Sequence, residues 1–405
     1  MKGGKLAVAV ALWLVCAYFL SRTIVPSLHL SGLDQHRFFT ASELRRAAHF
    51  SRGEQALFVL STIAKLAALA VLAWRLPRSV RAIGLGRIST AVVVTMVTLT
   101  ALWFTSLPFG LADLWWQHHW GLGPFGVYDW FSTQWATLAS EAISALAGIV
   151  LIVGLAGRYR RWWLPATAVV VAVTAFFAFI SGWAGSVGGH RLNDPQLRAD
   201  VTRLERVEHV QGTPVTVQTV SSFTSQANAF TVGFGPSTHV VLWDTLLDGR
   251  FSRAEVDVVI AHELGHVASR HIIKAIGWSA LVALPTLYLL ELATRRRGGI
   301  ADPANVPFAL LVLFVIVLVT TPIQNAVSRR DEAEADWHAL NAARDPSAQS
   351  ALFREFARTS LEEPDPPVLD YLWLENHPTL MQRIAMAKAW KVRCGRPSRA
   401  GPGCP

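Results

Sequence analysis

A His-Glu-Leu-Gly-His run at residues 262–266 is the part of this sequence best suited to chemistry. Histidines four positions apart lie one turn apart on the same face of an α-helix, so His262 and His266 can bind one Zn²⁺ through their imidazole nitrogens. Glu263 is offset by one position and would lie beside the metal without binding it. Its carboxylate could then accept a proton from a water that zinc activates.

The residues before this run favour a buried helix. Ser252-Arg-Ala-Glu255 has the pattern of a capping box, in which Ser252 caps the helix and Glu255 reaches back to its amide. Four apolar residues, 258–261, precede His262, which is typical of a helix that is buried rather than solvated. The alternative is a chance match, which arises in on the order of one chain in a hundred of this length.

A catalytic zinc needs a third protein ligand and an open position for water. Glu332 and Asp336 are four positions apart, so one could bind the metal while the other accepts the free N–H of a ligating histidine. An ordinary charged helix is the competing interpretation, and His338 is a rival third ligand. Glu334 points away from this face and is expected to be solvated or paired with Arg330.

The elements that must position these residues include many membrane spans. Of 405 residues, 52% are hydrophobic and 16% charged, against about a quarter charged in soluble proteins. Apolar runs of about 18 residues or more indicate helices that cross a bilayer. About seven runs qualify. They lie near Leu6–Leu20, Leu57–Trp74, Ser89–Leu107, Gln134–Leu155, Trp163–Trp183, Ile272–Leu292 and Val306–Ile323. The first is expected to be an uncleaved helix, because no small-residue cleavage site follows it.

The polar segment between the fifth and sixth runs predicts a small sheet. Apolar and polar residues alternate over 215–220, as in a half-buried strand. Further strands are expected at Ala229–Val232 and Thr238–Trp243, with a glycine- and proline-containing turn at 233–236 between them.

The net charge of +9 would suggest nucleic acid as a partner for a soluble protein. Here the arginines lie mainly beside the spans, where positive-inside topology and lipid headgroups explain them. The expected partner is therefore a lipid bilayer and not nucleic acid. Nothing in the sequence indicates an oligomer.

The basic loops also predict an orientation. Those that seven alternating spans place on one side contain Lys2, Lys5, and the arginines of 75–87, 158–161 and 295–297. The loop 108–133 has no Lys or Arg, so we expect a cytoplasmic N-terminus and an extracytoplasmic catalytic domain. In that oxidising compartment Cys394 and Cys404 could pair.

Several separated blocks resemble the membrane gluzincins that include the type I CAAX prenyl endoprotease and the bacterial heat-shock membrane protease. The five spans before the catalytic domain match the prenyl-protease branch better than the shorter heat-shock branch. The blocks are Asn228-Ala229 before a strand ending in Leu242-Trp-Asp-Thr-Leu-Leu247, His262-Glu-Leu-Gly-His266 continuing to His271, Ser328-Arg-Arg-x-Glu332-x-x-Ala-Asp336, and His377-Pro378 leading to Arg383.

For the metal, the resemblance implies one Zn²⁺ per chain. It would be held by His262, His266 and Glu332, with Glu263 as general base. Asp336 would then support a ligating histidine as a further catalytic residue.

For the substrate, the resemblance implies that the strand beginning at Asn228 and Ala229 pairs with an extended peptide. His377 and Arg383 would lie near the site and help to hold Glu332 or the tetrahedral oxyanion. From the sequence alone, His377 would be a neighbour of a helix N-cap and Arg383 a solvated helical residue.

The expected fold is mainly α and integral to the membrane, with about seven transmembrane helices. A zincin-type α+β catalytic domain, a small sheet plus an active-site helix, would be split around the last two spans. The expected divisions are a five-span domain at 1–186, a zinc peptidase domain at 187–392 with spans near 272–292 and 306–323, and a disordered tail at 393–405.

The expected function is therefore zinc-dependent endoproteolysis of membrane-associated or C-terminally lipid-modified (CAAX-like) proteins. The substrate partner would be a peptide or a membrane protein. A catalytically idle scaffold or receptor with the same fold is one alternative. A transporter is another, although no paired broken helices or inverted repeat are visible.

Overall fold

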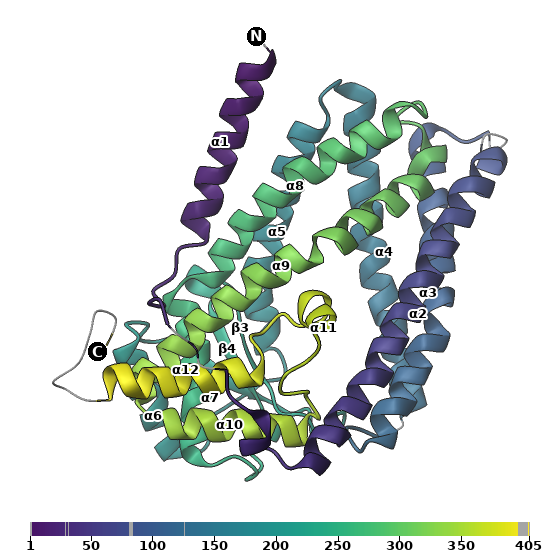
Figure 1. Ribbon diagram of the computed structural model, residues 1–405. Helices are drawn as coiled ribbons and strands as arrows, with labels where there is room; N and C mark the ends of the chain where they lie inside the picture. The colour runs from purple at the N-terminus through teal and green to yellow at the C-terminus, as the bar shows by residue number, and fades with distance from the viewer. Residues whose placement is uncertain are drawn as a thin grey trace. The chain divides into compact units, whose positions relative to one another are not determined.

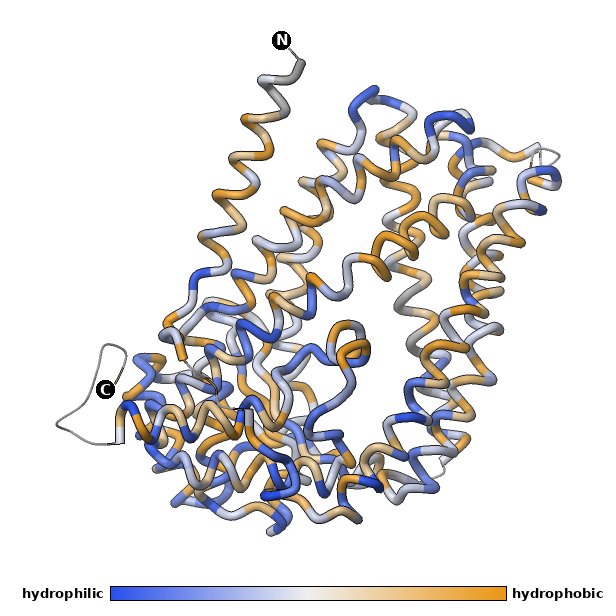
Figure 2. The backbone as a smooth tube through the Cα atoms, in the orientation of Figure 1, coloured by the Kyte–Doolittle hydropathy of each residue, from blue (hydrophilic) through white to orange (hydrophobic). Residues whose placement is uncertain are grey.

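Long helices dominate the computed structural model, which describes residues 2–28, 30, 32–80, 84–124, 126–395 and 404 (Figure 1). Among the described residues, five helices have the length and hydropathy of membrane spans: α2 (Ala41–Val80), α3 (Arg87–His119), α5 (Trp163–Ser186), α8 (His271–Arg295) and α9 (Val306–Ala343). Shorter apolar stretches occur in α1 (Lys2–Leu20) and α4 (Val127–Arg158). Hydrophobic residues run along these helices in Figure 2. All seven expected runs thus lie in helices, and the protein is a multi-pass membrane protein; the number of spans stays a prediction.

The chain forms two compact units, each made of segments that are distant in the sequence. One comprises residues 53–173 and 279–320. Its apolar core includes Val94 packed with Val153, and a second cluster around Trp162 and Leu290. The Trp162 indole N–H donates to a Glu291 carboxylate oxygen at 2.7 Å, which satisfies a polar group inside this unit.

The other unit, residues 1–52, 174–278 and 321–405, contains the sheet. Its strands are β1 (His190–Arg191), β2 (Val215–Gln218), β3 (Ala229–Val232) and β4 (His239–Trp243), in the order β1-β2-β4-β3. β2 runs parallel to β4, whereas β3 pairs antiparallel with β4. β3 is therefore an edge strand of this sheet, and its outer edge has no partner among the described strands.

Helix α7 (Arg253–Ala268) is held by its cap and by the core. The Glu255 amide donates to Ser252 Oγ, and the Ser252 amide donates to Glu255 Oε2 at 2.7 Å, so the predicted capping box is present. Ile260 and Leu264 on this helix are fully buried against Leu242 of β4. Ile260 and Leu264 lie on one face of the helix, so their burial fixes the helix rotation and hence the direction of its histidines.

The remaining helices of this unit complete the core around α7. They are α6 (Pro195–Val207), α10 (Pro346–Thr359), α11 (Val368–Trp373) and α12 (Leu380–Cys394), with short 3-10 turns at Gln35–Arg37, Gly235–Ser237, Asp244–Leu246 and, in the other unit, Pro303–Asn305. Leu204 of α6, Phe353 of α10 and Ile384 of α12 are buried in the same cluster as α7. The mainly helical fold with a small sheet and an active-site helix is as expected.

The end of the chain carries a disulfide. Cys394, the last residue of α12, is bonded to Cys404, which is the pairing that the sequence left open. Residues 396–403 and 405 of the expected disordered tail lie outside the described residues.

Candidate active site

Three side chains from α7 and α9 converge. His262, His266 and Glu332 each direct one ligand atom into a group whose members all lie within 4.8 Å of one another. The His262 and His266 Nε2 atoms are 3.0 Å apart. Glu332 Oε2 lies 3.2 Å from His262 Nε2, and Oε1 lies 3.6 Å from His266 Nε2.

The hydrogen bonds of these side chains are compatible with a bound metal ion. Asp336 Oδ1 lies 3.0 Å from His262 Nδ1, and a carboxylate can only accept, so Nδ1 bears a hydrogen and Nε2 is the nitrogen that a metal ion could bind in place of a proton. Glu332 Oε2 is buried and lies 3.2 Å from both His262 Nε2 and His377 Nε2. Two imidazole nitrogens and one carboxylate are a ligand set of catalytic zinc sites, so the residues fit this metal.

The charge around His262 points the same way. Burial lowers the pKa of His262, but its hydrogen bonds with Asp336 and Glu332 outweigh burial and raise the pKa to about 10. The two carboxylates thus stabilise positive charge between them, and a bound cation would compete with the proton for this position.

Asp336 is held in turn by Arg383 of α12. The guanidinium donates from Nε to Oδ2 at 2.8 Å and from Nη2 to Oδ1 at 2.7 Å, and it lies 4.0 Å from the centre of the Phe353 ring. Arg383 is buried, so the expectation from the sequence alone, a solvated residue, was wrong. The resemblance implied a place near the site, and the structure puts Arg383 behind Asp336.

Glu263 lies beside the three converging groups and is buried. The Thr231 hydroxyl of β3 is 2.9 Å from Glu263 Oε2 and 3.0 Å from the Glu263 carbonyl oxygen. Thr231 of β3 therefore helps to fix the orientation of the glutamate. The sequence analysis missed Thr231; its only signal was its place in the strand that begins at Ala229.

His377 is a partly exposed residue that contacts Glu332. Its Nε2 is 3.2 Å from Glu332 Oε2, its Nδ1 is 2.6 Å from Asn376 Oδ1, and its side chain is 43% exposed. The helix that follows begins at Leu380 with Thr379 as N-cap, so His377 belongs to the loop before α12.

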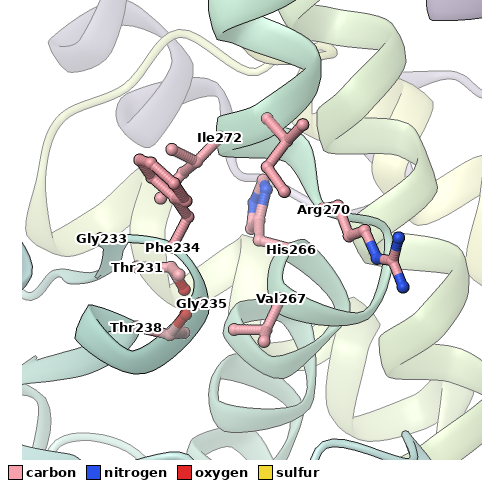
Figure 3. A pocket seen from close by; sticks show the side chains of 10 residues that line it. Thr231, Gly233, Phe234, Gly235, Thr238, His266, Val267, Arg270 and Ile272 are labelled. Carbon is pink, nitrogen blue, oxygen red and sulfur yellow. The ribbon is translucent and has the colours of Figure 1, made fainter. Parts of the chain in front are cut away.

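Two hollows flank the middle of β3. One, of about 80 Å³, is lined by Asn228, Ala229, Glu263, His377 and others. The second, of about 50 Å³, lies between the end of β3 and the end of α7. Figure 3 shows Thr231, Phe234 and Ile272 facing His266 and Val267 across it, with Arg270 pointing away. Residues of β3 line both hollows.

Two further expectations concerned α9. His338, the rival third ligand, bonds with Glu208 and with Ser269 and is absent from the converging group. Glu334 was expected to be solvated or paired with Arg330, and this was wrong. It is buried and contacts a histidine and a lysine of α8, partners that no local pattern indicates.

Comparisons with known proteins show which proteins the chain is similar to. Residues 191–391 match the model of peptidase family M48. The chain is 28% identical over 242 residues to an uncharacterized metalloprotease, YhfN, of Bacillus subtilis, covering 56% of this chain and 57% of that protein. It is 28% identical over 179 residues to the CAAX prenyl protease 1 homolog of Oryza sativa subsp. japonica, covering 41% and 40%. The matches thus span about half the length of these relatives.

The crystal structure of S. mikatae Ste24p has a similar fold. It superposes with a TM-score of 0.72 at 18% sequence identity, covering 94% of this chain and 97% of that one. At this identity the likeness shows the fold, which extends over nearly the whole chain.

Proposed function

The chain belongs to peptidase family M48, the membrane metalloproteases, and on that premise we propose that it is a zinc metalloendopeptidase acting on membrane-associated or C-terminally lipid-modified proteins. One observation carries the proposal: the ligand atoms of His262, His266 and Glu332 converge, and Glu263 lines the same hollow as His262. Both histidines have Nδ1 engaged in a hydrogen bond, so their Nε2 atoms are available to one metal ion.

We assign the zinc to these three residues, one ion per chain. When bound there, zinc would act as a Lewis acid that makes water nucleophilic near neutral pH. Glu263 accepts the proton from the attacking water and can pass it to the leaving amine, because its carboxylate is held by Thr231 and is not among the metal-binding group. His377 Nε2 can contact Glu332 or the substrate oxyanion, and Arg383 acts through Asp336.

We propose that the substrate backbone binds along the outer edge of β3. Asn228 and Ala229 begin this strand, and an extended peptide added there would pass Glu263. The hollows on either side of Thr231 would each receive a substrate side chain. Main-chain pairing supplies affinity without reading side chains, which fits a protease with a broad choice of sequence.

A membrane-associated substrate fits a hydrolytic site in a chain with several apolar helices. We further propose that the N-terminus is cytoplasmic and the site extracytoplasmic. The basic loops of the sequence support this orientation, and so does the Cys394–Cys404 disulfide, because disulfides persist outside the cytosol.

Substrate peptides of two kinds test the proposal. Peptides blocked at both termini should be cut internally by the full-length protein in detergent, whereas an exopeptidase would need a free end. Matched CAAX peptides with and without a farnesyl group then test the substrate class. Faster cleavage of the lipidated member supports it, and equal rates would leave an endopeptidase without lipid preference.

A further inference from the structure

His266 has a partner of an unusual kind for a metal-binding histidine. Its Nδ1 lies 2.8 Å from Nδ1 of His271, a buried residue at the start of α8. The two rings are separated by a short turn in which Arg270 has a positive φ of 54°. His262 has a carboxylate in the corresponding position, so the two imidazoles are supported differently.

The hydrogen bonds continue beyond His271. Its Nε2 is 3.1 Å from Glu334 Oε2, and the same oxygen accepts from Lys274 Nζ at 2.6 Å. Glu334 Oε1 accepts from the backbone N–H of Ile24 at 3.0 Å. Lys274 Nζ is also 3.4 Å from the Arg22 carbonyl oxygen, so the segment after α1 contributes to this arrangement.

With both imidazoles neutral, one assignment of protons satisfies the contacts from Lys274 through His271 to His266. Glu334, held by a lysine and a backbone amide, is a carboxylate and can only accept, so His271 bears its hydrogen on Nε2. His271 Nδ1 is then a lone pair that accepts from His266 Nδ1–H. That leaves the His266 Nε2 lone pair directed towards His262 and Glu332.

We propose that His271 is a positioning residue for the metal site: it fixes the tautomer and ring orientation of His266, and Glu334 with Lys274 fixes those of His271. This inference rests on the proposed function only in taking His266 as a metal ligand. It makes the first turn of α8 and the segment 22–24 part of the support of the metal centre.

A second cation site is the competing interpretation. Ligand atoms of His271, Asp331 and Glu334 also lie within 4.8 Å of one another. However, the Lys274 ammonium already neutralises Glu334 at 2.6 Å, and both His271 nitrogens have partners. A relay of hydrogen bonds accounts for the contacts without an added ion.

The test compares zinc affinities, measured by competition with a chelator on full-length protein without substrate. In His271→Leu the affinity should fall about 10- to 100-fold, the usual effect of removing a partner of a ligating histidine. His271→Gln should keep most of the affinity, because its amide oxygen can accept from His266 and its amide nitrogen can donate to Glu334. Thermal unfolding of the zinc-free proteins checks that each variant folds.

His338→Leu is the matched control. His338 is another largely buried histidine with two hydrogen-bond partners, Glu208 and Ser269, but it has none among the proposed ligands. Unchanged affinity in His271→Leu, or an equal loss in His338→Leu, would overturn the inference. Two zinc ions per wild-type chain, with one lost in His271→Leu, would establish the second cation site instead. Wild-type protein that binds no zinc would overturn the proposed function too, whereas bound zinc without cleavage would count against the protease alone.

Discussion

Arg383 and Asp336 form a buried, two-pronged ion pair behind the proposed metal centre, with both carboxylate oxygens engaged at 2.8 and 2.7 Å. The Asp336 oxygen Oδ1 also meets His262 Nδ1. Asp336 therefore stays ionised in a buried place because a guanidinium faces it. The pair orients His262 while it keeps the proton on Nδ1.

Removal of one partner of this pair should be more damaging than removal of both. In Arg383→Met the Asp336 carboxylate keeps a buried charge without its cation, which costs about 3–5 kcal/mol. The double variant Arg383→Met/Asp336→Leu should be more stable than the sum of the single losses predicts. Thermal unfolding of the four zinc-free proteins measures this coupling, and strictly additive losses would contradict it.

Thr231 should matter to turnover and not to metal binding. Thr231→Val removes the hydroxyl that lies 2.9 Å from Glu263 Oε2 while keeping the shape of the side chain. Loss of about 1.4 kcal/mol of stabilisation would lower kcat about tenfold. Zinc content should be unchanged. Thr216→Val is the control, because that hydroxyl contacts His239 in the sheet, 3.0 Å away. An equal fall in kcat in both variants would mean that the sheet, and not Glu263, is affected.

Glu332 should be required for zinc and its neighbour Asp331 should not. Glu332→Gln keeps the size of the side chain but removes the anionic donor that lies 3.2 Å from His262 Nε2. Zinc affinity should fall by at least a factor of about 100, because carboxylate ligation requires the charged form. Asp331→Asn changes the same charge one position earlier on α9. Equal zinc affinities for the two variants would rule out Glu332 as the third ligand.

The loop that leads into β3 should become unstable at acid pH. Burial raises the pKa of Asp244, but hydrogen bonds from Val220 N at 2.9 Å and Ser221 Oγ at 2.7 Å outweigh burial and lower it. A carboxyl group with a lowered pKa stabilises the fold above its unfolded pKa of about 3.9, and this contribution is lost as pH falls through the folded value.

Asp244→Asn isolates this contribution. The Tm difference between wild type and variant should be largest at pH 6 to 7 and should shrink as the pH falls below about 4. Thermal unfolding across that range measures it. A difference that does not change with pH would show that Asp244 carries no such linkage.

The local features of the site could be predicted because their signals are local. Ser252 and Glu255 predict the start of α7, and the spacing of His262 and His266 predicts their shared face. The strands at 229–232 and 239–243 were expected on either side of a glycine- and proline-containing turn. The parallel pairing of β2 with β4 could not be predicted, because periodicity says nothing about which strands become neighbours.

Partners distant in sequence are the part that could not be predicted. Arg383 lies 47 positions after Asp336, and Lys274 lies 60 positions before Glu334. In the sequence alone, Arg383 looks like a solvated helical residue, whereas Lys274 lies within an expected membrane span. Burial brings these charges together, and burial depends on the packing of α8, α9 and α12 in three dimensions. The resemblance suggested a place for Arg383 but not its contact.

Metal content and peptide cleavage, measured on detergent-purified wild type and Glu263→Gln, test the central claim most directly. Glu263 is outside the converging ligand group, so both proteins should bind about one zinc per chain. Only the wild type should cut a peptide library, because the variant lacks the general base. An absence of zinc from both proteins, or cleavage by Glu263→Gln at the wild-type rate, would contradict the account.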